Sequence, residues 1–261
     1  MNFEPITAFI VFMSFLIGSC LGSFTNVVID RLPAGVGLVY GRSYCEKCKK
    51  TLLPQDLVPI FSYLLLGGKC RFCKEKIPAR LFYVEALIGL SLATISYFFL
   101  NGLVPLYQAI YIFIIIDLST AIFFTDIEYG IIPDQLVIIA TVLIFIYNLV
   151  YTPQLLVGNV LAGISAAIVF LILFLVTSGK GMGFGDVKLS FVLGLFLGFP
   201  RVVVGVYLAF LTGALISIIL ILLGKKKLKR DTIPFGPFLV MGMLIAFLFG
   251  NFLIEKALFY F

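Results

Sequence analysis

Two aspartates that lie where apolar segments meet polar loops are the residues of this sequence best suited to chemistry. Asp126 follows the apolar run 103–125, and Asp186 ends a Gly-Phe-Gly-Asp motif directly before the apolar run 187–199. An ionisable residue at the edge of a membrane span costs free energy unless it is paired, hydrated or functional. Two such carboxylates on one side of a membrane can share a proton and activate a water, as they do in aspartic peptidases. Asp126 and Asp186 are therefore the candidate catalytic pair.

The overall composition predicts a protein that crosses a membrane many times. Apolar residues make up 62% of the 261 residues, only 12% are charged, and the mean hydropathy is +1.17. Soluble domains do not reach such values. A helix needs about 20 residues to cross a hydrocarbon core of about 30 Å. The apolar runs that suggest spans lie near residues 6–29, 82–100, 103–125, 131–151, 154–177, 187–199, 201–223 and 234–254.

The distribution of basic residues predicts the orientation of these spans. Cytoplasmic loops of membrane proteins hold an excess of Lys and Arg. With eight spans, the polar segments 30–81, 126–130, 178–188 and 224–233 share one side and contain 17 of the 19 basic residues. Both aspartates are thus expected to open onto the cytoplasm. We interpret the basic loops as solvated flanks or lipid-headgroup contacts, because no nucleic-acid-binding motif accompanies them.

Four cysteines in the first polar segment predict a metal site. Cys45 and Cys48 form one Cys-x-x-Cys knuckle, and Cys70 and Cys73 form a second. Tetrahedral zinc favours four such sulfur ligands, and a closed four-ligand site leaves no position for substrate, so the metal is expected to be structural. A reducing compartment argues against two structural disulfides, although redox activity of one cysteine pair stays open.

The expected fold is an all-α polytopic membrane protein with about eight transmembrane helices and a small cytoplasmic loop domain stapled by metal. Seven spans is the alternative count, if residues 187–223 form one long kinked element. The predicted parts are a first transmembrane helix (1–29), a cytoplasmic four-cysteine zinc-binding domain (30–81) and a membrane catalytic domain that holds the aspartate pair (82–261).

Other carboxylates are weaker candidates than this pair, and the absence of histidine excludes every His-based mechanism. Asp117 lies nine residues before Asp126. This spacing puts it on the opposite helix face and about 13 Å deeper, where an interhelical hydrogen bond is expected. Asp134 follows a proline at the start of a span, where a carboxylate interacts well with the helix dipole. Asp186 itself has a plain alternative as a helix N-cap. Lys188, two residues further on, should not face Asp186 on a helix.

The glycines before Asp186 suggest how a substrate could reach it. Gly183 and Gly185 allow close approach of another backbone, so an extended substrate strand could dock beside the acid. Together with Asp134 they are the candidate substrate-docking or supporting residues. The glycine pattern at 181–185 also fits a nucleotide-binding loop, but no βαβ unit surrounds it.

Several segments together resemble one enzyme family. They are residues 22–33, the two cysteine knuckles, residues 68–71, 80–85, 125–134, 181–189 and 234–237. With them the chain resembles the type IV prepilin peptidases, integral-membrane aspartic enzymes with a Gly-x-Gly-Asp signature. By this resemblance Asp126 and Asp186 are the catalytic dyad. One departure is Glu46, which stands where the family often has proline.

The resemblance implies an inner-membrane enzyme that cuts the basic leader from prepilin and pseudopilin precursors on the cytoplasmic face. Many members then N-methylate the new terminus with S-adenosylmethionine, and the four-cysteine loop favours this bifunctional form. A related peptidase that cleaves signal peptides or preflagellins without methylation is the nearer alternative. A transporter or scaffold is the more distant one, and it predicts internal repeats, which the sequence lacks.

Overall fold

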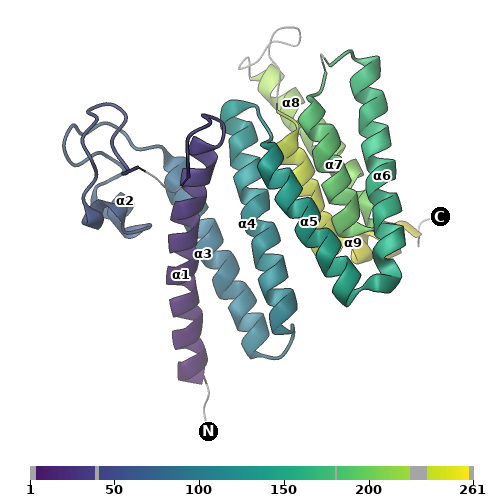
Figure 1. The fold of residues 1–261 in the computed structure, drawn as a ribbon, viewed down its shortest axis with the longest axis horizontal. Helices are drawn as coiled ribbons and strands as arrows, with labels where there is room; N and C mark the ends of the chain where they lie inside the picture. The colour runs from purple at the N-terminus through teal and green to yellow at the C-terminus, as the bar shows by residue number, and fades with distance from the viewer. Residues whose placement is uncertain (1–3, 39–40, 180, 224–233, 259–261) are drawn as a thin grey trace. The chain divides into compact units, whose positions relative to one another are not determined.

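The computed structural model describes residues 4–38, 41–179, 181–223 and 234–258, and helices dominate this range (Figure 1). No β-strand occurs within it, only two isolated β-bridges. Lys180 and the basic run 225–230, both in predicted cytoplasmic loops, lie outside the described residues. The helices in the described part are α1 (Glu4–Arg31), η1 (Pro54–Leu57), α2 (Phe61–Leu65), α3 (Ala79–Leu100), α4 (Leu106–Tyr129), α5 (Asp134–Tyr151), α6 (Pro153–Val176), α7 (Phe184–Leu197), α8 (Arg201–Leu222) and α9 (Gly236–Leu258).

The predicted all-α membrane fold is confirmed. Seven of the described helices, namely α1, α3, α4, α5, α6, α8 and α9, are long and apolar enough to cross a membrane. The eighth predicted span corresponds to α7, which has only 14 residues. At 1.5 Å per residue it is about 21 Å long and falls short of a hydrocarbon core of about 30 Å. The count is therefore seven full-length candidates and one short helix.

α7 and α8 are separate helices, so the alternative of one kinked element over residues 187–223 is wrong. α7 ends at Leu197, and its C-cap residue Gly198 has a positive φ of 65°. α8 begins directly after Pro200. A glycine with positive φ and a proline two residues later stop a helix, because glycine adopts positive φ without strain and proline cannot continue the hydrogen-bond ladder.

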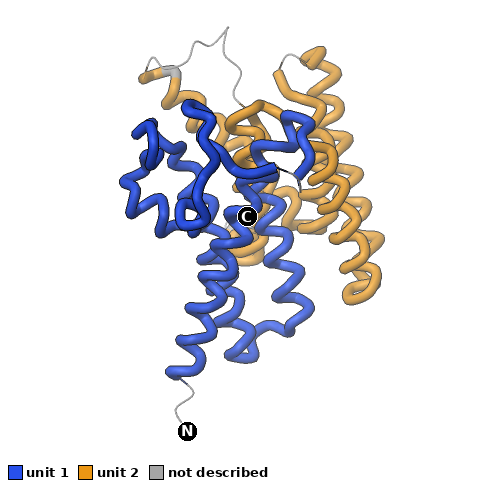
Figure 2. The backbone as a smooth tube through the Cα atoms, turned by 60° about the vertical axis from the view of Figure 1, so that its left-hand side comes forward, with its two compact units in different colours: residues 1–121 blue, residues 122–261 orange. Residues whose placement is uncertain are grey.

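The chain forms two compact units, residues 1–121 and 122–261, with the boundary inside α4 (Figure 2). In the first unit, α1 packs tightly on α3. Gly18 and Gly22 of α1 are buried there, and a Cβ added to Gly22 would lie 2.8 Å from the Cα of Glu85. Small residues let membrane helices approach this closely, which raises the van der Waals contact between them.

In the second unit, α7 is largely enclosed by its neighbours. Nine of its 14 residues are buried, and it packs mainly on α6. At this contact a Cβ on Gly194 would lie 2.5 Å from the carbonyl oxygen of Ala162. The side-chain amide of Asn148, in α5, donates to the Leu195 carbonyl at 3.2 Å. Such enclosure explains how a helix too short to span a bilayer can lie among longer ones, since its polar groups find partners inside the protein.

The close α1–α3 packing predicts that Gly22→Ala is destabilising. The new Cβ would meet backbone atoms of α3, which cannot move aside alone. We expect the free energy of unfolding to fall by about 1–3 kcal/mol, as in other overpacked cores. Gly158→Ala in α6 is the matched control, because a Cβ there meets nothing within 4 Å. Thermal unfolding of both variants in one detergent measures the difference, and equal melting temperatures would contradict the packing account.

Candidate active site and metal centre

Asp126 is held in the last turns of α4 by the beginning of α9. Its side chain is 5% exposed, and its Oδ2 accepts a hydrogen bond of 3.0 Å from the backbone N–H of Gly236. The first N–H groups of a helix have no intrahelical partner and carry partial positive charge. Asp126 therefore caps a helix that starts 110 residues later in the chain. A Cβ on Gly236 would lie 2.6 Å from this oxygen, so glycine is needed for the contact.

Asp186 is the third residue of α7 and is held by its own helix start. Its Oδ2 accepts a hydrogen bond of 3.1 Å from the N–H of Gly183, and its own N–H donates to the Gly183 carbonyl. Gly183 is the N-cap residue. The carboxylate therefore caps the helix from inside the first turn, as the acidic member of a capping box does. The expectation that Asp186 caps this helix is therefore correct, except that Gly183 occupies the N-cap position and Asp186 the third helical position.

Ile132 connects the two aspartate positions within the second unit. A Cβ on Gly185, the neighbour of Asp186, would lie 3.0 Å from the Cβ of Ile132. The Ile132 side chain also borders Gly236, because a Cβ added to Gly236 would lie 3.1 Å from the Cδ1 of Ile132. The two carboxyl groups are close enough for their charges to interact. The structure therefore brings the predicted pair together.

The surroundings of the pair suit acid–base chemistry. Both side chains are almost completely buried, and each uses Oδ2 to accept one backbone N–H. Among the described residues, no hydrogen bond reaches the Oδ1 atom of Asp126 or Asp186. Two oriented carboxyl groups in a site of low polarity can hold one water, with one acting as base and the other as acid.

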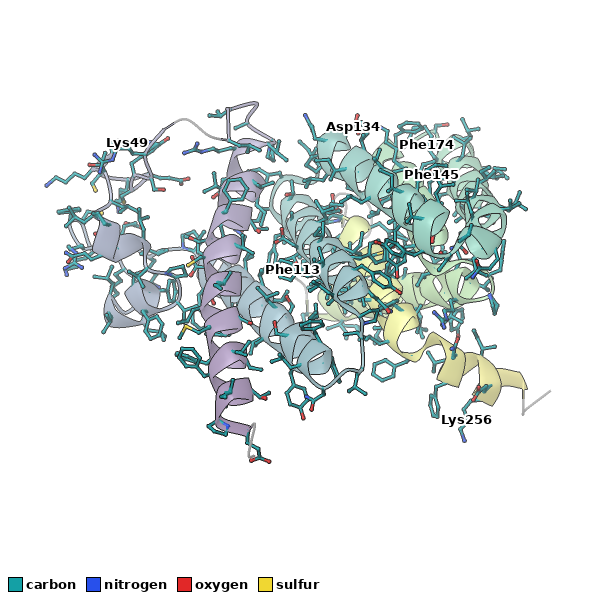
Figure 3. The ribbon with its side chains drawn as sticks, turned by 60° about the horizontal axis from the view of Figure 1, so that its bottom comes forward. Lys49, Phe113, Asp134, Phe145, Phe174 and Lys256 are labelled. Atoms are coloured by element: carbon teal, nitrogen blue, oxygen red, sulfur yellow. The ribbon has the colours of Figure 1, made fainter. Side chains whose placement is uncertain are left out.

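The other predicted acids lie elsewhere. Asp134 begins α5 at the position labelled in Figure 3, and its Oδ1 accepts a hydrogen bond of 2.7 Å from Lys188. Lys188 is also 5.2 Å from the ring centre of Phe184. The lysine is therefore directed to Asp134, in agreement with the expectation that it does not face Asp186.

Asp117 forms the predicted interhelical hydrogen bond. Its Oδ1 is 2.6 Å from the hydroxyl of Thr25, so the bond joins α4 to α1 within the first unit. Thr25 is also 3.0 Å from the carbonyl of Leu21. The Thr25 hydroxyl can donate its one proton to either of these two oxygens. This residue is accounted for without a catalytic role.

The four cysteines converge on one point, as the spacing of the two knuckles predicts. Their sulfur atoms all lie within 4.8 Å of one another, and those of Cys45 and Cys73 are 3.7 Å apart. A tetrahedral zinc ion with bonds of about 2.3 Å to sulfur sets its ligands about 3.8 Å apart. The donor set therefore fits a single metal ion.

The two knuckles repeat the same backbone turn. The N–H of Lys49 donates to the Cys45 carbonyl at 2.8 Å, and the N–H of Lys74 donates to the Cys70 carbonyl at 3.0 Å. Both lysines have a φ of 57°, an uncommon value for residues other than glycine. Such repeated turns orient both sulfurs of each knuckle toward a shared centre, which supports a structural ion rather than a chance cluster.

The backbone of the first knuckle favours a thiolate. Hydrogen bonds from the backbone of Cys48 and then Lys47 lower the pKa of the Cys45 thiol to about 7. At Cys73 a hydrogen bond from the Glu75 backbone favours the thiolate, but desolvation and the neighbouring sulfurs outweigh it and raise the pKa to about 11. Sulfur atoms this close compete for negative charge, and a central cation removes that competition.

Comparison of the sequence with known proteins identifies the family of this chain. A family model described as "Bacterial Peptidase A24 N-terminal domain" matches residues 16–99, and one described as "Type IV leader peptidase family" matches residues 112–218. The chain is 30% identical over 241 residues to the "Prepilin leader peptidase/N-methyltransferase" of Bacillus subtilis (strain 168), with 92% of this chain and 95% of that protein covered. This chain belongs to the type IV leader peptidase family.

Further relatives in this family extend the match. A protein of Pseudomonas aeruginosa with the same name is 31% identical over 268 residues, with 92% of this chain and 91% of the relative covered. One from Aeromonas salmonicida (strain A449) is 30% identical, with coverage of 91% and 90%. No significant match to a solved structure was found. The first matched region contains all four knuckle cysteines, and the second contains both aspartates.

Two residues of the site were not predicted. Gly236 lies in a segment that resembles a family motif, but its residue type alone indicates no role in the site. Nothing in the sequence indicates a role for Ile132, because isoleucine is common throughout this apolar chain. The structure identifies Gly236 by its hydrogen bond to Asp126 at the end of α4, and Ile132 by its position beside both Gly236 and Gly185.

The knuckle geometry predicts that replacing Cys45 and Cys48 by serine releases about one equivalent of metal and loosens residues 40–80, since structural metal binding is coupled to folding. Elemental analysis and hydrogen exchange of the purified protein measure both effects. Cys20→Ser is the control, because Cys20 lies in α1 and outside the cluster. Wild-type protein that contains neither zinc nor iron would refute the metal site.

Proposed function

We propose that this chain is a membrane aspartic endopeptidase that removes the leader peptide of type IV prepilins and pseudopilins. The observation that carries the proposal is the pair Asp126 and Asp186, which come from different helices, are both buried, and are each oriented by one backbone N–H. The names of the relatives that match the chain over about nine-tenths of its length support the substrate class.

The reaction follows from the two carboxyl groups acting as a base and an acid. One carboxylate removes a proton from a water held between them, and the water oxygen bonds to the scissile carbonyl carbon. The other carboxyl, initially protonated, donates its proton to the carbonyl oxygen. The tetrahedral intermediate then breaks its C–N bond, and the leaving amine takes up a proton from the dyad. The shared proton belongs to the pair rather than to one residue.

The segment before Asp186 is the proposed docking site for the substrate backbone. Gly183 is extended, with φ −77° and ψ 153°. Gly183 and Gly185 have no side chain to obstruct an approaching strand, whose amides could pair with this backbone. Asp134 has a supporting role in this proposal, because its ion pair with Lys188 joins the starts of α5 and α7.

The chain is also proposed to methylate the new N-terminus. The relatives carry both activities in their names, and S-adenosylmethionine supplies the methyl group in such reactions. No described residue is assigned to its binding. The metal in the four-cysteine cluster is proposed to be zinc, held by Cys45, Cys48, Cys70 and Cys73, where its contribution is to stabilise the loop.

The proposed location is the inner membrane with the dyad open to the cytoplasm. The excess of Lys and Arg in the loops on that side supports this orientation. A precursor would then lie with its apolar helix in the bilayer and its basic leader in the cytoplasm, so that the scissile bond reaches the depth of Asp126 and Asp186.

We predict that Asp126→Asn and Asp186→Asn each reduce leader cleavage by at least about 100-fold, since general acid–base groups contribute 10²–10⁴-fold and neither remaining carboxyl can serve as both. An asparagine oxygen can still accept the backbone N–H, so both variants should stay folded. Mass spectrometry of a pilin-like precursor incubated with purified protein and S-adenosylmethionine measures cleavage and methylation separately.

The control for this prediction is Asp117→Asn. Asp117 bonds to Thr25, so its variant should keep substantial cleavage activity. Near-normal turnover by Asp126→Asn or Asp186→Asn would remove that residue from the dyad. A wild-type protein that leaves several pilin-like precursors intact would contradict the proposed function as a whole.

A further inference from the structure

The segment that joins the two cysteine knuckles exposes an apolar surface. We name as the inter-knuckle patch the exposed apolar side chains of η1, α2 and the residues beside them, which are Leu53, Leu57, Val58, Phe61, Leu64 and Leu65. Leu65 is 87% exposed, and Leu64 is 60% exposed. Large apolar side chains exposed within one short segment of a loop domain indicate a surface that meets a partner or a membrane.

The patch is tied to the membrane helices rather than free in the loop. The backbone N–H of Ile60, directly before α2, donates to Oε2 of Glu85 at 2.7 Å in a buried bond. Glu85 is the seventh residue of α3, about 9 Å along the helix from its start. Ser23 of α1 also hydrogen-bonds to Glu85. α2 is thus held beside the bodies of two membrane-spanning helices.

The backbone at this attachment is strained. Ile60 has a φ of 65°, which a β-branched residue rarely adopts. Strain of this kind persists only where surrounding contacts impose it, and here the buried bond to Glu85 does so. Figure 1 shows α2 beside α1 and not beyond its end. The bond to Glu85 therefore sets α2 at a level about 9 Å along α3 from the start of that helix.

The charge of the loop fits the surface of a membrane. Residues 30–81 contain ten basic and four acidic residues, a net charge of +6, which equals the formal charge of the whole chain. Three of the acids are already paired, Asp30 with Arg80, Asp56 with Arg71 and Glu75 with Lys47. The remaining excess is positive, and anionic lipid headgroups attract basic segments within a Debye length of the surface.

A hollow beside α2 offers a place for one such headgroup. Its volume is about 480 Å³, and its lining includes Tyr63, Gly67, Gly68, Lys69 and Lys76. Both lysines are exposed, and they are joined by the β-bridge at the base of the second knuckle. Lysine ammonium groups and a tyrosine hydroxyl are suited to bind a phosphate, because each can donate a hydrogen bond to it.

We propose that the inter-knuckle segment is a membrane-interface anchor. The inter-knuckle patch inserts at the boundary of headgroups and acyl chains, while Lys69 and Lys76 bind the phosphate of an anionic phospholipid in the hollow. An apolar face combined with basic residues is the composition of interfacial anchors. The anchor would keep the knuckles against the bilayer, and it does not depend on the proposed peptidase activity.

The depth of the patch can be measured with tryptophan fluorescence, because the natural chain has no tryptophan. Leu65→Trp places a single probe at a side chain that makes little contact within the protein. The full-length variant is reconstituted into vesicles of phosphatidylcholine and phosphatidylglycerol in which the phosphatidylcholine is brominated at a shallow or a deep acyl position. We expect a loss of emission that is greater with shallow bromine.

Two further single-tryptophan variants set the scale. Leu90→Trp probes an exposed position in the middle of α3 and should be quenched most by deep bromine. Tyr44→Trp probes an exposed position beside Lys49 in the first knuckle and should be quenched least. Emission from Leu65→Trp that is no more quenched than that from Tyr44→Trp would overturn the anchor. The anchor would also be overturned if the Leu65→Trp emission shifted to shorter wavelength only at a higher protein-to-lipid ratio, which would assign the patch to a second copy of the chain. A shift that occurs only after a precursor is added would assign the patch to substrate.

The headgroup site is tested by native mass spectrometry of the full-length protein titrated with phosphatidylglycerol or phosphatidylcholine. Lys69→Gln with Lys76→Gln should abolish the preference for phosphatidylglycerol. Lys49→Gln with Lys50→Gln removes the same charge outside the hollow and should leave most of the preference. Equal losses in the two double variants would overturn the specific site, and so would displacement of the lipid by inorganic phosphate, which would identify a site for the free ion.

Discussion

The arrangement of the site depends on one hydrogen bond, from the backbone N–H of Gly236 to Oδ2 of Asp126. It joins the end of α4 to the start of α9 and satisfies two groups that would otherwise be buried without partners. In a site of low polarity such a bond is strong, and the cost of leaving either group unpaired is large. Ile132 packs against Gly236 and also against Gly185, so the same contact sets the distance to the start of α7.

Within the second unit, close helix contacts support this bond. α7 carries Asp186 on its first turn and is too short to cross a bilayer alone, but its burial against α6 and α5 holds its start in place. The hydrogen bond from Gly183 then orients the carboxylate. Each aspartate is therefore fixed by a backbone N–H at a helix start, a position where carboxylates are favoured by the helix dipole.

In the first unit, close helix packing and buried hydrogen bonds hold the cysteine loop against the membrane helices. Glycines let α1 and α3 approach closely, and Thr25 and Asp117 join α1 to α4 by a hydrogen bond. Glu85, buried between these helices and the loop, accepts the N–H of Ile60. The knuckle cysteines of the same loop converge on one point, where they could hold a metal ion. A loop too small for a hydrophobic core of its own gains stability from such a site and from the buried bond.

The helices, the cysteine cluster and the two aspartates could be predicted from the sequence because each leaves a local signal. Apolar runs set the spans within a few residues, paired cysteines set the knuckles, and Asp186 lies in a short glycine motif. Helix geometry also showed that Lys188 does not face Asp186, but not that its partner is Asp134. Partners such as Gly236 for Asp126, or Glu85 for Ile60, were not predictable, since they join segments far apart in the chain and backbone N–H groups carry no residue-type signal.

The most direct test is to compare leader cleavage by Gly236→Ala and Gly158→Ala. A Cβ on residue 236 would lie 2.6 Å from Oδ2 of Asp126 and must displace the carboxylate, whereas a Cβ on residue 158 of α6 meets nothing within 4 Å. A misplaced catalytic group costs about 100-fold in rate. We expect a loss of that order in Gly236→Ala and near-normal cleavage in Gly158→Ala. Equal activity in the two variants would contradict the claim that the hydrogen bond from Gly236 positions Asp126 for catalysis.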